Sequence, residues 1–489
     1  MSSAITQIQS AGKWRIRGTT IALVVSVAVA TAILLSFAGD FLIDSDVTVV
    51  MLVSLVFFAM LAFAAGYGRD RAQSSKWLIL IIWWGLLASE EVFSYRSTLS
   101  STSSSDFASE AYAQGFLWVI ALLGLLVVLV RSPQQLRGLF QGDYKWVSWI
   151  AVASILSSVY SPNPAFSLAW AFKLGLIVVV VHVCAREMTE IEDMRKFLYV
   201  TIFAFVFLTV LPTLRSLFEA DPLGDYGSRD LEQRFREAPT ELSAIAGLLV
   251  LLCLMVYSRG RRRWPLAIAA LSFILMVVAG GKTGIVAGFI SGLLFYALQR
   301  RVKAALGFAA VMLIAMVLAL EFTPLAAYMQ NYSRLEQFSS FTGRTGLWQF
   351  VLPYILQRPI LGHGFNSSRF IAVLHPDTPF SSAHMHNSLL EAFYDNGLIG
   401  LGLLLMILFV IGRNLYRVMR STESEEVRYL AVGGMAALVN LFINGMFNST
   451  FGGRPDASYM MLIALVVISS HLLQMSQNVR ESRTLAASV

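Results

Sequence analysis

Apolar runs long enough to cross a bilayer as helices recur along this 489-residue chain. A spanning helix needs about 20 mainly apolar residues. The chain is 56% hydrophobic and only 14% charged, which is too little charge for the surface of a soluble protein of this size. The sequence therefore predicts an all-α polytopic membrane protein with about 12–14 transmembrane helices. The fourteen runs are residues 19–39, 47–67, 76–95, 111–130, 144–160, 165–185, 196–218, 241–258, 264–280, 283–298, 304–323, 391–412, 427–447 and 457–474.

The distribution of lysine and arginine predicts the orientation, because short cytoplasmic loops are enriched in both. If the N-terminus is cytoplasmic, the cytoplasmic loops and the two ends carry 25 of the 37 basic residues. The opposite loops carry 11, and Lys173 lies within a predicted span. Both ends are therefore expected to be cytoplasmic. The net charge of +7 follows from this topology, so no nucleic-acid partner is predicted.

The eleven basic residues on the outer side depart from this distribution, so they are candidates for a function in binding. Arginine's planar fork binds phosphate oxygens in pairs, and lysine adds a point charge. We interpret Arg234, Arg236, Lys282 and Arg344 as candidates for binding an anionic lipid-linked group near the membrane surface. Others are interpreted as ordinary loop charges paired with neighbouring carboxylates; they are Arg215, Arg229 and Arg454.

Four of the six histidines fall in the longest polar stretch, residues 324–390. Apolar residues at helical spacing predict a short helix within 342–359 that ends before Pro359. The glycines of residues 361–365 permit a tight turn. A second helix is expected to begin after a cap at Ser381, Ser382 or Asn387 and to stop or kink at Asn396-Gly397.

Histidine titrates near neutral pH and therefore suits proton transfer, but it is also a common zinc ligand. A zinc site made of His363, His375, His384 and His386 is disfavoured, because no cysteine and no tight carboxylate pattern accompanies them. His363, between two glycines, is expected to donate a hydrogen bond within a turn. No metal and no cofactor is predicted.

Three motifs in this stretch resemble the O-antigen ligase and polymerase family. They read Thr-Gly-Arg-Thr-Gly-Leu-Trp (342–348), Arg-Pro-Ile-Leu-Gly-His-Gly-Phe (358–365), and His-Asn-Ser-Leu-Leu-Glu (386–391) followed by Asn-Gly-Leu-Ile-Gly (396–400). The resemblance is specific over about 342–402 and looser over 230–290. It implies a GT-C-like fold and the transfer of a glycan from undecaprenyl diphosphate to an acceptor hydroxyl on the outer face of the inner membrane, without a metal.

The resemblance also implies roles for particular residues. His386, directly before Asn387, would be the general base of an inverting transfer. Arg344 would bind substrate, together with Lys282, where relatives often have arginine, and with Arg234 or Arg236, between which the spacing does not choose. Further substrate contacts are expected from residues around the base; they are His384, Asn387 and Glu391.

These expectations divide the chain into a transmembrane bundle (1–218), the helices that start the ligase-like domain (219–323), a periplasmic catalytic loop (324–390) and C-terminal transmembrane helices (391–489). The expected partners are the lipid-linked glycan, membrane lipids, and either an acceptor glycan or lipid A-core. A polymerase is slightly favoured over a ligase. The alternative is a transporter or flippase of lipid-linked oligosaccharide, which would need charged or broken spans near the bilayer midplane.

Overall fold

The computed structural model describes residues 71–89, 118–119, 121–130, 132–218, 239–257, 263–279, 281–322, 344–374 and 385–488. These residues form helices and no strands, as the apolar runs predicted. The helices are α5 (Arg71–Ala88), η1 (Pro133–Leu136), η2 (Gly142–Tyr144), α8 (Lys145–Ser157), η3 (Ser158–Tyr160), α9 (Pro164–Glu187), α10 (Ile191–Phe218), α12 (Pro239–Tyr257), α13 (Trp264–Val278), α14 (Lys282–Leu298), α15 (Val302–Phe322), α18 (Arg344–Gln357), η4 (Ser367–Phe370), α19 (Ile371–Leu374), α20 (Ser388–Ser421), α21 (Glu425–Phe447) and α22 (Ala457–Ser488).

Within these described residues, five helical segments are long and apolar enough to cross a membrane, namely 164–187, 240–257, 388–421, 425–447 and 457–478. Shorter apolar helices match other predicted runs, including 264–277, 282–298 and 302–315. The run at 144–160 gives only the 13-residue α8 and the short η3. α20 begins at Ser388, three residues before the predicted start at 391. The runs at 19–39 and 47–67 lie outside the described residues, so the number of spans stays a prediction.

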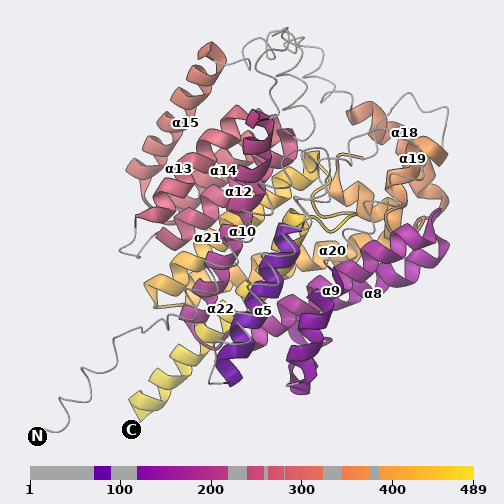
Figure 1. Ribbon diagram of the computed structural model, residues 1–489. Helices are drawn as coiled ribbons and strands as arrows, with labels where there is room; N and C mark the ends of the chain where they lie inside the picture. Colours follow the sequence, from indigo (N-terminus) through magenta and orange to yellow (C-terminus); the bar gives the residue numbers. More distant parts are fainter. Residues whose placement is uncertain are drawn as a thin grey trace, which may run out of the picture.

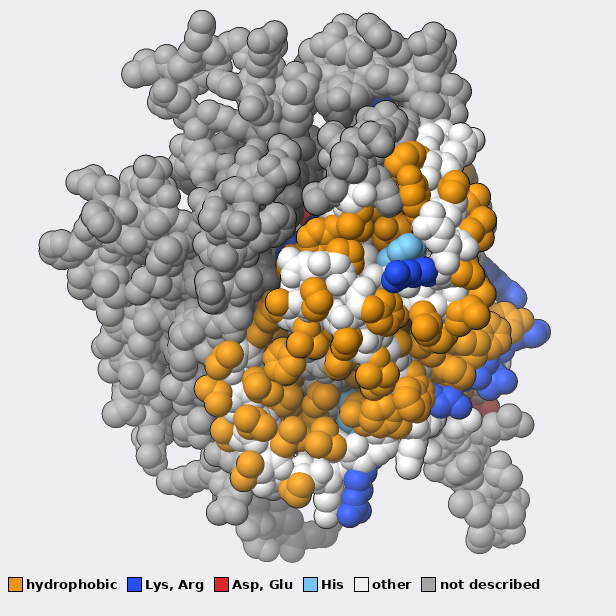
Figure 2. Space-filling view, turned by 90° about the vertical axis from the view of Figure 1, so that its right-hand side faces the viewer, with side chains coloured by type: hydrophobic (Ala, Val, Ile, Leu, Met, Phe, Trp, Pro, Cys, Tyr) orange, Lys and Arg blue, Asp and Glu red, His pale blue; other side chains and the backbone are white. Residues whose placement is uncertain are grey.

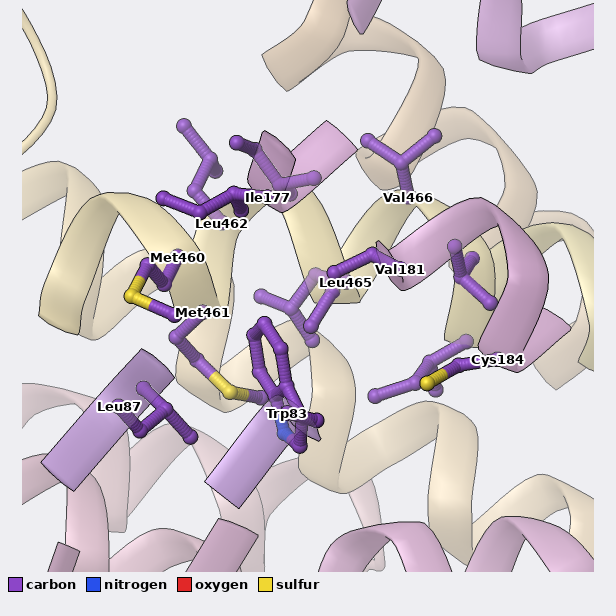
Figure 3. Close-up of a cluster of buried hydrophobic side chains, with 14 of the residues drawn as sticks. Trp83, Leu87, Ile177, Val181, Cys184, Met460, Met461, Leu462, Leu465 and Val466 are labelled. Carbon is purple, nitrogen blue, oxygen red and sulfur yellow. The ribbon is translucent and has the colours of Figure 1, made fainter. Parts of the chain in front are cut away.

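The core lies where helices from both ends of the sequence meet. α5, α9 and α22 pack together in Figure 1, and Figure 3 shows Trp83 of α5 between side chains of the other two helices, among them Val181 and Leu465. Trp83 is fully buried, and its indole Nε1 donates a 3.0 Å hydrogen bond to Thr201 Oγ1 of α10. A buried indole keeps its N–H paired in this way, so the core joins four helices.

Small residues let α14 approach α12 closely. Gly284, Gly288 and Ser291 are buried on one side of α14, and a Cβ at Gly284 would lie 2.5 Å from Ser243 Oγ. Lipid provides no hydrophobic driving force between helices, so close packing along a row of small residues stabilises their association instead. Ser243 Oγ lies 3.1 Å from both Met276 O and Gly281 O, so α12 holds the turn that precedes Lys282.

A broad face of the molecule is apolar at its surface. Figure 2 shows hydrophobic side chains over much of this face, with most Lys and Arg side chains at its edges. Exposed apolar side chains on α8, α9 and α18 include Trp149, Leu156, Leu168, Phe172 and Leu356. A water-soluble monomer rarely exposes so much contiguous apolar surface, and a protein in lipid does so normally.

α20 is broken at Gly397, where the predicted Asn396-Gly397 stop or kink lies, with φ 63° and ψ −159°. The break releases two carbonyls and two amides from the helix. His363 N donates to Tyr394 O and Gly364 N donates to Asp395 O, both at 2.8 Å. Leu398 N and Ile399 N donate instead to the carbonyls of Pro359 and Ile360. The 359–364 segment therefore replaces the lost helical hydrogen bonds.

Two glycines make this close approach possible. A Cβ at Gly397 would lie 2.2 Å from Ile360 O, and a Cβ at Gly362 would lie 2.5 Å from Asp395 O. Both have positive φ, 63° at Gly397 and 71° at Gly362, which glycine adopts without steric cost. The turn predicted for residues 361–365 thus packs directly against the kink.

We expect Gly397→Ala to lower the melting temperature of the detergent-solubilised protein by several degrees. The backbone conformation at Gly397 is essentially restricted to glycine and alone costs a residue with a Cβ about 1–3 kcal/mol, and the overlap with Ile360 O adds to that. Gly402→Ala, on the same helix with nothing within 4 Å of the added Cβ, is the matched control and should leave the melting temperature unchanged or slightly higher. Equal melting temperatures for the two variants would contradict this account of the kink.

Candidate functional site

The short helix α18 presents one apolar side to the rest of the protein. Leu347, Val351 and Ile355 recur at intervals of four residues and are all buried. They pack in one cluster with Met385, just before α20, and with Tyr394 on α20. This packing sets α18 beside the start of α20, which Figure 1 shows together with α19 at one end of the molecule.

Arg344 is the first residue of α18 and is half-buried. Its Nη2 lies 3.5 Å from Asn448 Oδ1, in the loop between α21 and α22. Burial lowers the pKa of the Arg344 guanidinium below its ordinary value. The group remains a cation at neutral pH, because arginine starts from a pKa above 12. A half-buried guanidinium facing a loop amide is a suitable anchor for an anion.

Met385, the residue before His386, is held at both of its backbone groups. Glu391 Oε1 accepts a 3.2 Å hydrogen bond from Met385 N, and Trp348 Nε1 donates a 2.8 Å hydrogen bond to Met385 O. Ser449 Oγ also donates to Glu391 Oε1. Two side chains from α18 and α20 therefore fix the backbone immediately before the candidate base.

Asn387, the residue after His386, caps α20. Its Oδ1 accepts hydrogen bonds from Leu389 N (3.0 Å) and Leu390 N (3.1 Å), which satisfies two amides at the start of the helix. Its Nδ2 donates to Met446 O at 3.2 Å. Of the three caps that the sequence allowed, the structure uses Asn387. Both ends of this side-chain amide therefore make hydrogen bonds within the protein.

His386 has a left-handed backbone, with φ 51°. A residue with a Cβ adopts this conformation only when its surroundings impose it, and such strain is often found at functional sites. Burial, and then the positive charge of Arg344, lower the pKa of the His386 imidazole to about 4. The ring is therefore neutral at pH 7, which is the form that accepts a proton.

The loop from Asn448 to Asp456 closes over the start of α20. Ser388 Oγ donates to Asn448 O at 3.1 Å, and it accepts from Thr450 N (2.9 Å) and Phe451 N (3.1 Å). A Cβ at Gly452 would lie 2.0 Å from Ser388 O, so only glycine permits this approach. The hydroxyl of Ser388 thus fastens the loop that meets Arg344.

Asp395 organises the neighbouring turn. Its buried carboxylate accepts from Asn366 N (3.0 Å), Ser368 N (2.7 Å) and Ser368 Oγ (3.1 Å). These bonds fix η4, which carries Arg369. Burial, and then the nearby charge of Arg454, lower the pKa of the Arg369 guanidinium to about 10, while Glu391 acts in the opposite direction.

The structure brings together Arg344, His386, Asn387 and Glu391 from the predicted site. Lys282 begins α14, which packs on α12 and α21, so its part in the site stays a prediction. Arg234, Arg236 and His384 lie outside the described residues, and so does His375. His363 makes the predicted turn hydrogen bond, with its Nε2 2.8 Å from Tyr354 O and its ring stacked on Tyr394.

A metal centre has no ligand set in the part of the chain that the structure describes: no group of three or more His, Cys, Asp or Glu side chains there is suited to bind one. His363 is held by Tyr354 and His386 lies beside the Arg344 cation. A positive neighbour disfavours binding of a second cation at His386.

Sequence reasoning missed Trp348, Asn448 and Ser449 as parts of the site. Asn448 and Ser449 belong to the polar segment Asn448-Ser-Thr-Phe-Gly-Gly453, which joins two apolar spans. Polar residues followed by two glycines between spans are a signal of a tight loop. Nothing in that pattern says which distant segment the loop contacts, because the contact depends on how α20 and α21 pack.

Comparison with known proteins supports the resemblance over this region. Residues 280–405 match a family model described as O-Antigen ligase, and this segment contains Arg344, His386 and Glu391. The similarity to the O-antigen ligase family, expected from the motifs at 342–402, is confirmed for this segment.

Proteins provisionally named as polysaccharide ligases are similar over parts of the chain. The one from Rickettsia prowazekii is 28% identical over 117 residues, which is 22% of this chain and 26% of that protein. The one from Rickettsia felis is 24% identical over 207 residues, or 40% of this chain and 49% of that protein. The similarity thus covers about a quarter to a half of these relatives.

We expect Arg344→Gln to raise the pKa of His386, because it removes the positive charge that disfavours imidazolium. The measurement is the pH dependence of His386 carbethoxylation by diethyl pyrocarbonate, read by peptide mass spectrometry, since only the neutral ring reacts. The midpoint should move to higher pH in Arg344→Gln and stay in place in Arg358→Gln, a neutralisation at an exposed arginine after α18. An unchanged midpoint in Arg344→Gln would show that the two groups are not coupled.

Proposed function

We propose that the protein is a membrane glycosyltransferase of the O-antigen ligase type. It moves a glycan from undecaprenyl diphosphate to an acceptor sugar hydroxyl on the outer face of the inner membrane. The observation that carries this proposal is the neutral His386, held in a left-handed conformation beside the Arg344 cation. The O-Antigen ligase match over 280–405 and the names of the relatives support the same reaction class.

In the proposed reaction His386 removes the proton from the acceptor hydroxyl, whose oxygen forms a bond to the anomeric carbon. The bond from that carbon to the diphosphate oxygen breaks, and its electron pair leaves with the diphosphate. A single displacement inverts the anomeric centre. Arg344, Lys282 and one of Arg234 or Arg236 offset the negative charge that develops on the leaving group, so no metal is required.

The low pKa of the free imidazole is itself part of the mechanism. A base of pKa about 4 is weak at neutral pH, where the most effective base has a pKa near that pH. A diphosphate bound at Arg344 offsets the charge that lowers this pKa. Donor binding therefore strengthens the base by the part of the pKa shift that Arg344 causes, while burial, the larger cause, continues to lower the pKa of His386.

Asn387 and Glu391 were expected to contact substrate, and we propose a different task for them. Their side chains hold the backbone on either side of His386 through Leu389 N, Leu390 N and Met385 N. In this proposal they position the base, whereas His384 contacts the acceptor.

The acceptor distinguishes two forms of this function. A ligase passes the glycan to lipid A-core, and a polymerase passes it to another lipid-linked repeat unit. Deletion of the gene separates them: single lipid-linked repeat units accumulate when a polymerase is lost, and finished long chains accumulate when a ligase is lost. We favour the polymerase.

The proposed topology places residues 324–390 on the outer, periplasmic side and both chain ends in the cytoplasm. Alkaline phosphatase fused within 324–343 should be active and green fluorescent protein fused there should be dark, because each reporter works on one side only. The opposite pattern is expected for fusions at Thr422–Ser424, between α20 and α21. Fluorescence from the 324–343 fusion would exclude catalysis on the outer face.

We expect His386→Ala to reduce glycan transfer by roughly two to four powers of ten, the usual contribution of a general base. The assay uses purified full-length protein with lipid-linked donor and acceptor supplied in detergent, so that transport across a membrane plays no part. Protein yield and melting temperature should stay close to those of the wild type.

His375→Ala is the matched histidine control and should be nearly silent. Near-normal transfer by His386→Ala in this assay would remove His386 as the base. A complete absence of transfer by the wild type, together with movement of lipid-linked glycan across vesicles, would favour the flippase alternative.

A further inference from the structure

A group of cations and aromatic rings lies on α9, beside the proposed site. Phe166, Trp170 and Lys173 recur at helical spacing on one side of α9. Lys173 is fully buried within the span, and its Nζ lies 4.9 Å from the centre of the Trp170 ring and 5.5 Å from that of Trp118. An ionisable residue inside a span is costly and commonly marks a site of function.

Arg454, from the loop between α21 and α22, lies on the same ring. Its guanidinium carbon is 4.3 Å from the centre of the Trp170 ring, close enough for a cation–π interaction. Trp170 therefore has two cations against it, one from its own helix and one from a loop that is distant in sequence.

Arg369 adds a third cation. The charges of Arg369 and Arg454 act on each other, and η4 is fixed by Asp395 so that Phe370, next to Arg369, packs edge-on against Phe166 at 5.5 Å. Bringing two guanidinium groups together in half-buried positions is unfavourable in itself, and a bound anion would offset this repulsion.

Carboxylates near Arg369 offset part of this positive charge. Glu391, Glu241 and Asp456 all act on Arg369. Two of them have other donors: Glu391 Oε1 accepts from Met385 N and Ser449 Oγ, and Asp456 Oδ1 accepts from Tyr459 N at the start of α22. The site is thus partly neutralised, which suits a ligand that has to be released.

The loop from Asn448 to Asp456 connects this group with Arg344. Asn448, at one end, meets Arg344, and Arg454, near the other end, meets Trp170. Glu391 interacts with both parts, through Ser449 of the loop and with Arg369. A cation thus lies at each end of the loop, with Arg344 at Asn448 and Arg454 at Trp170.

We propose that Arg369 and Arg454, supported by Trp170 and Lys173, form a second anion subsite that binds the phosphate of the membrane-anchored acceptor. This inference rests on the proposed function, in which donor and acceptor are both anchored in lipid. It assigns the donor diphosphate to Arg344 and the acceptor phosphate to Arg369 and Arg454, with His386 between the two substrates.

The test is a binding measurement on the full-length protein in nanodiscs of zwitterionic lipid, with farnesyl phosphate as the probe and farnesol as its uncharged counterpart. The readout is the part of the tryptophan fluorescence change that disappears in Trp170→Phe. Farnesyl phosphate should give a saturable change, and farnesol should not. Arg454→Gln and Arg369→Gln should each weaken binding about tenfold or more, as expected for loss of one charge-assisted contact of roughly 1.4 kcal/mol or more.

Arg358→Gln is the matched control, because it neutralises an exposed arginine outside the proposed subsite. Arg344→Gln tests whether the two subsites are separate. Neither substitution should change the Trp170 signal. Loss of the signal in Arg344→Gln but not in Arg454→Gln would overturn the second subsite. Equal binding of farnesol would overturn phosphate recognition. The measurement is repeated in nanodiscs that contain phosphatidylglycerol in an amount that carries the same charge as the added farnesyl phosphate. If phosphatidylglycerol prevents binding of the probe, the subsite binds bulk lipid headgroups, and the acceptor assignment is overturned.

Because no turnover is needed, this measurement stays informative if glycan transfer fails. His386→Ala should bind farnesyl phosphate as the wild type does. Failure of transfer with intact binding would contradict the proposed function alone, and intact transfer with no Trp170 signal would contradict the second subsite alone.

Discussion

The break in α20 at Gly397 leaves four backbone groups without helical partners, and in a membrane such groups must be satisfied within the protein. Residues 359–364 supply all four partners, two donors and two acceptors. These four hydrogen bonds fix the position of residues 359–364, and with it the end of α18, the turn around His363 and the start of η4. The arrangement of Arg344 on α18, Arg369 on η4 and His386 before α20 therefore depends on this single pairing of a kinked helix with a glycine-rich turn.

A second set of hydrogen bonds fixes the backbone on both sides of the candidate base. Trp348 and Glu391 hold Met385, and Asn387 caps the helix that follows. His386 lies between two fixed residues, so its unfavourable left-handed backbone persists. The hydrogen bonds of Met385 and Asn387 thus fix the backbone on both sides of the His386 ring.

Features set by local physics could be predicted from the sequence, and features set by distant contacts could not. Hydrophobic length predicted the helices, Asn387 appeared among the predicted caps, and Asn396-Gly397 was predicted as a stop or kink. The pairing of Asn448 with Arg344 and of Arg454 with Trp170 joins residues 104 and 284 positions apart. Arg454 was interpreted as an ordinary loop charge because its aromatic partner lies in a span that carries no sign of the contact.

Electrostatics then links the base to its substrates. Arg344 lowers the pKa of His386 in the free protein, so the charge that would bind a diphosphate also weakens the base while the donor site is empty. A bound diphosphate reverses this effect, because its negative charge offsets that of Arg344. Arg454 lies near the opposite end of the Asn448–Asp456 loop from the Asn448–Arg344 contact, and an acceptor phosphate bound there would offset its repulsion with Arg369. In the proposed function, each substrate would therefore offset positive charge in the free protein, and the donor would also raise the pKa of His386.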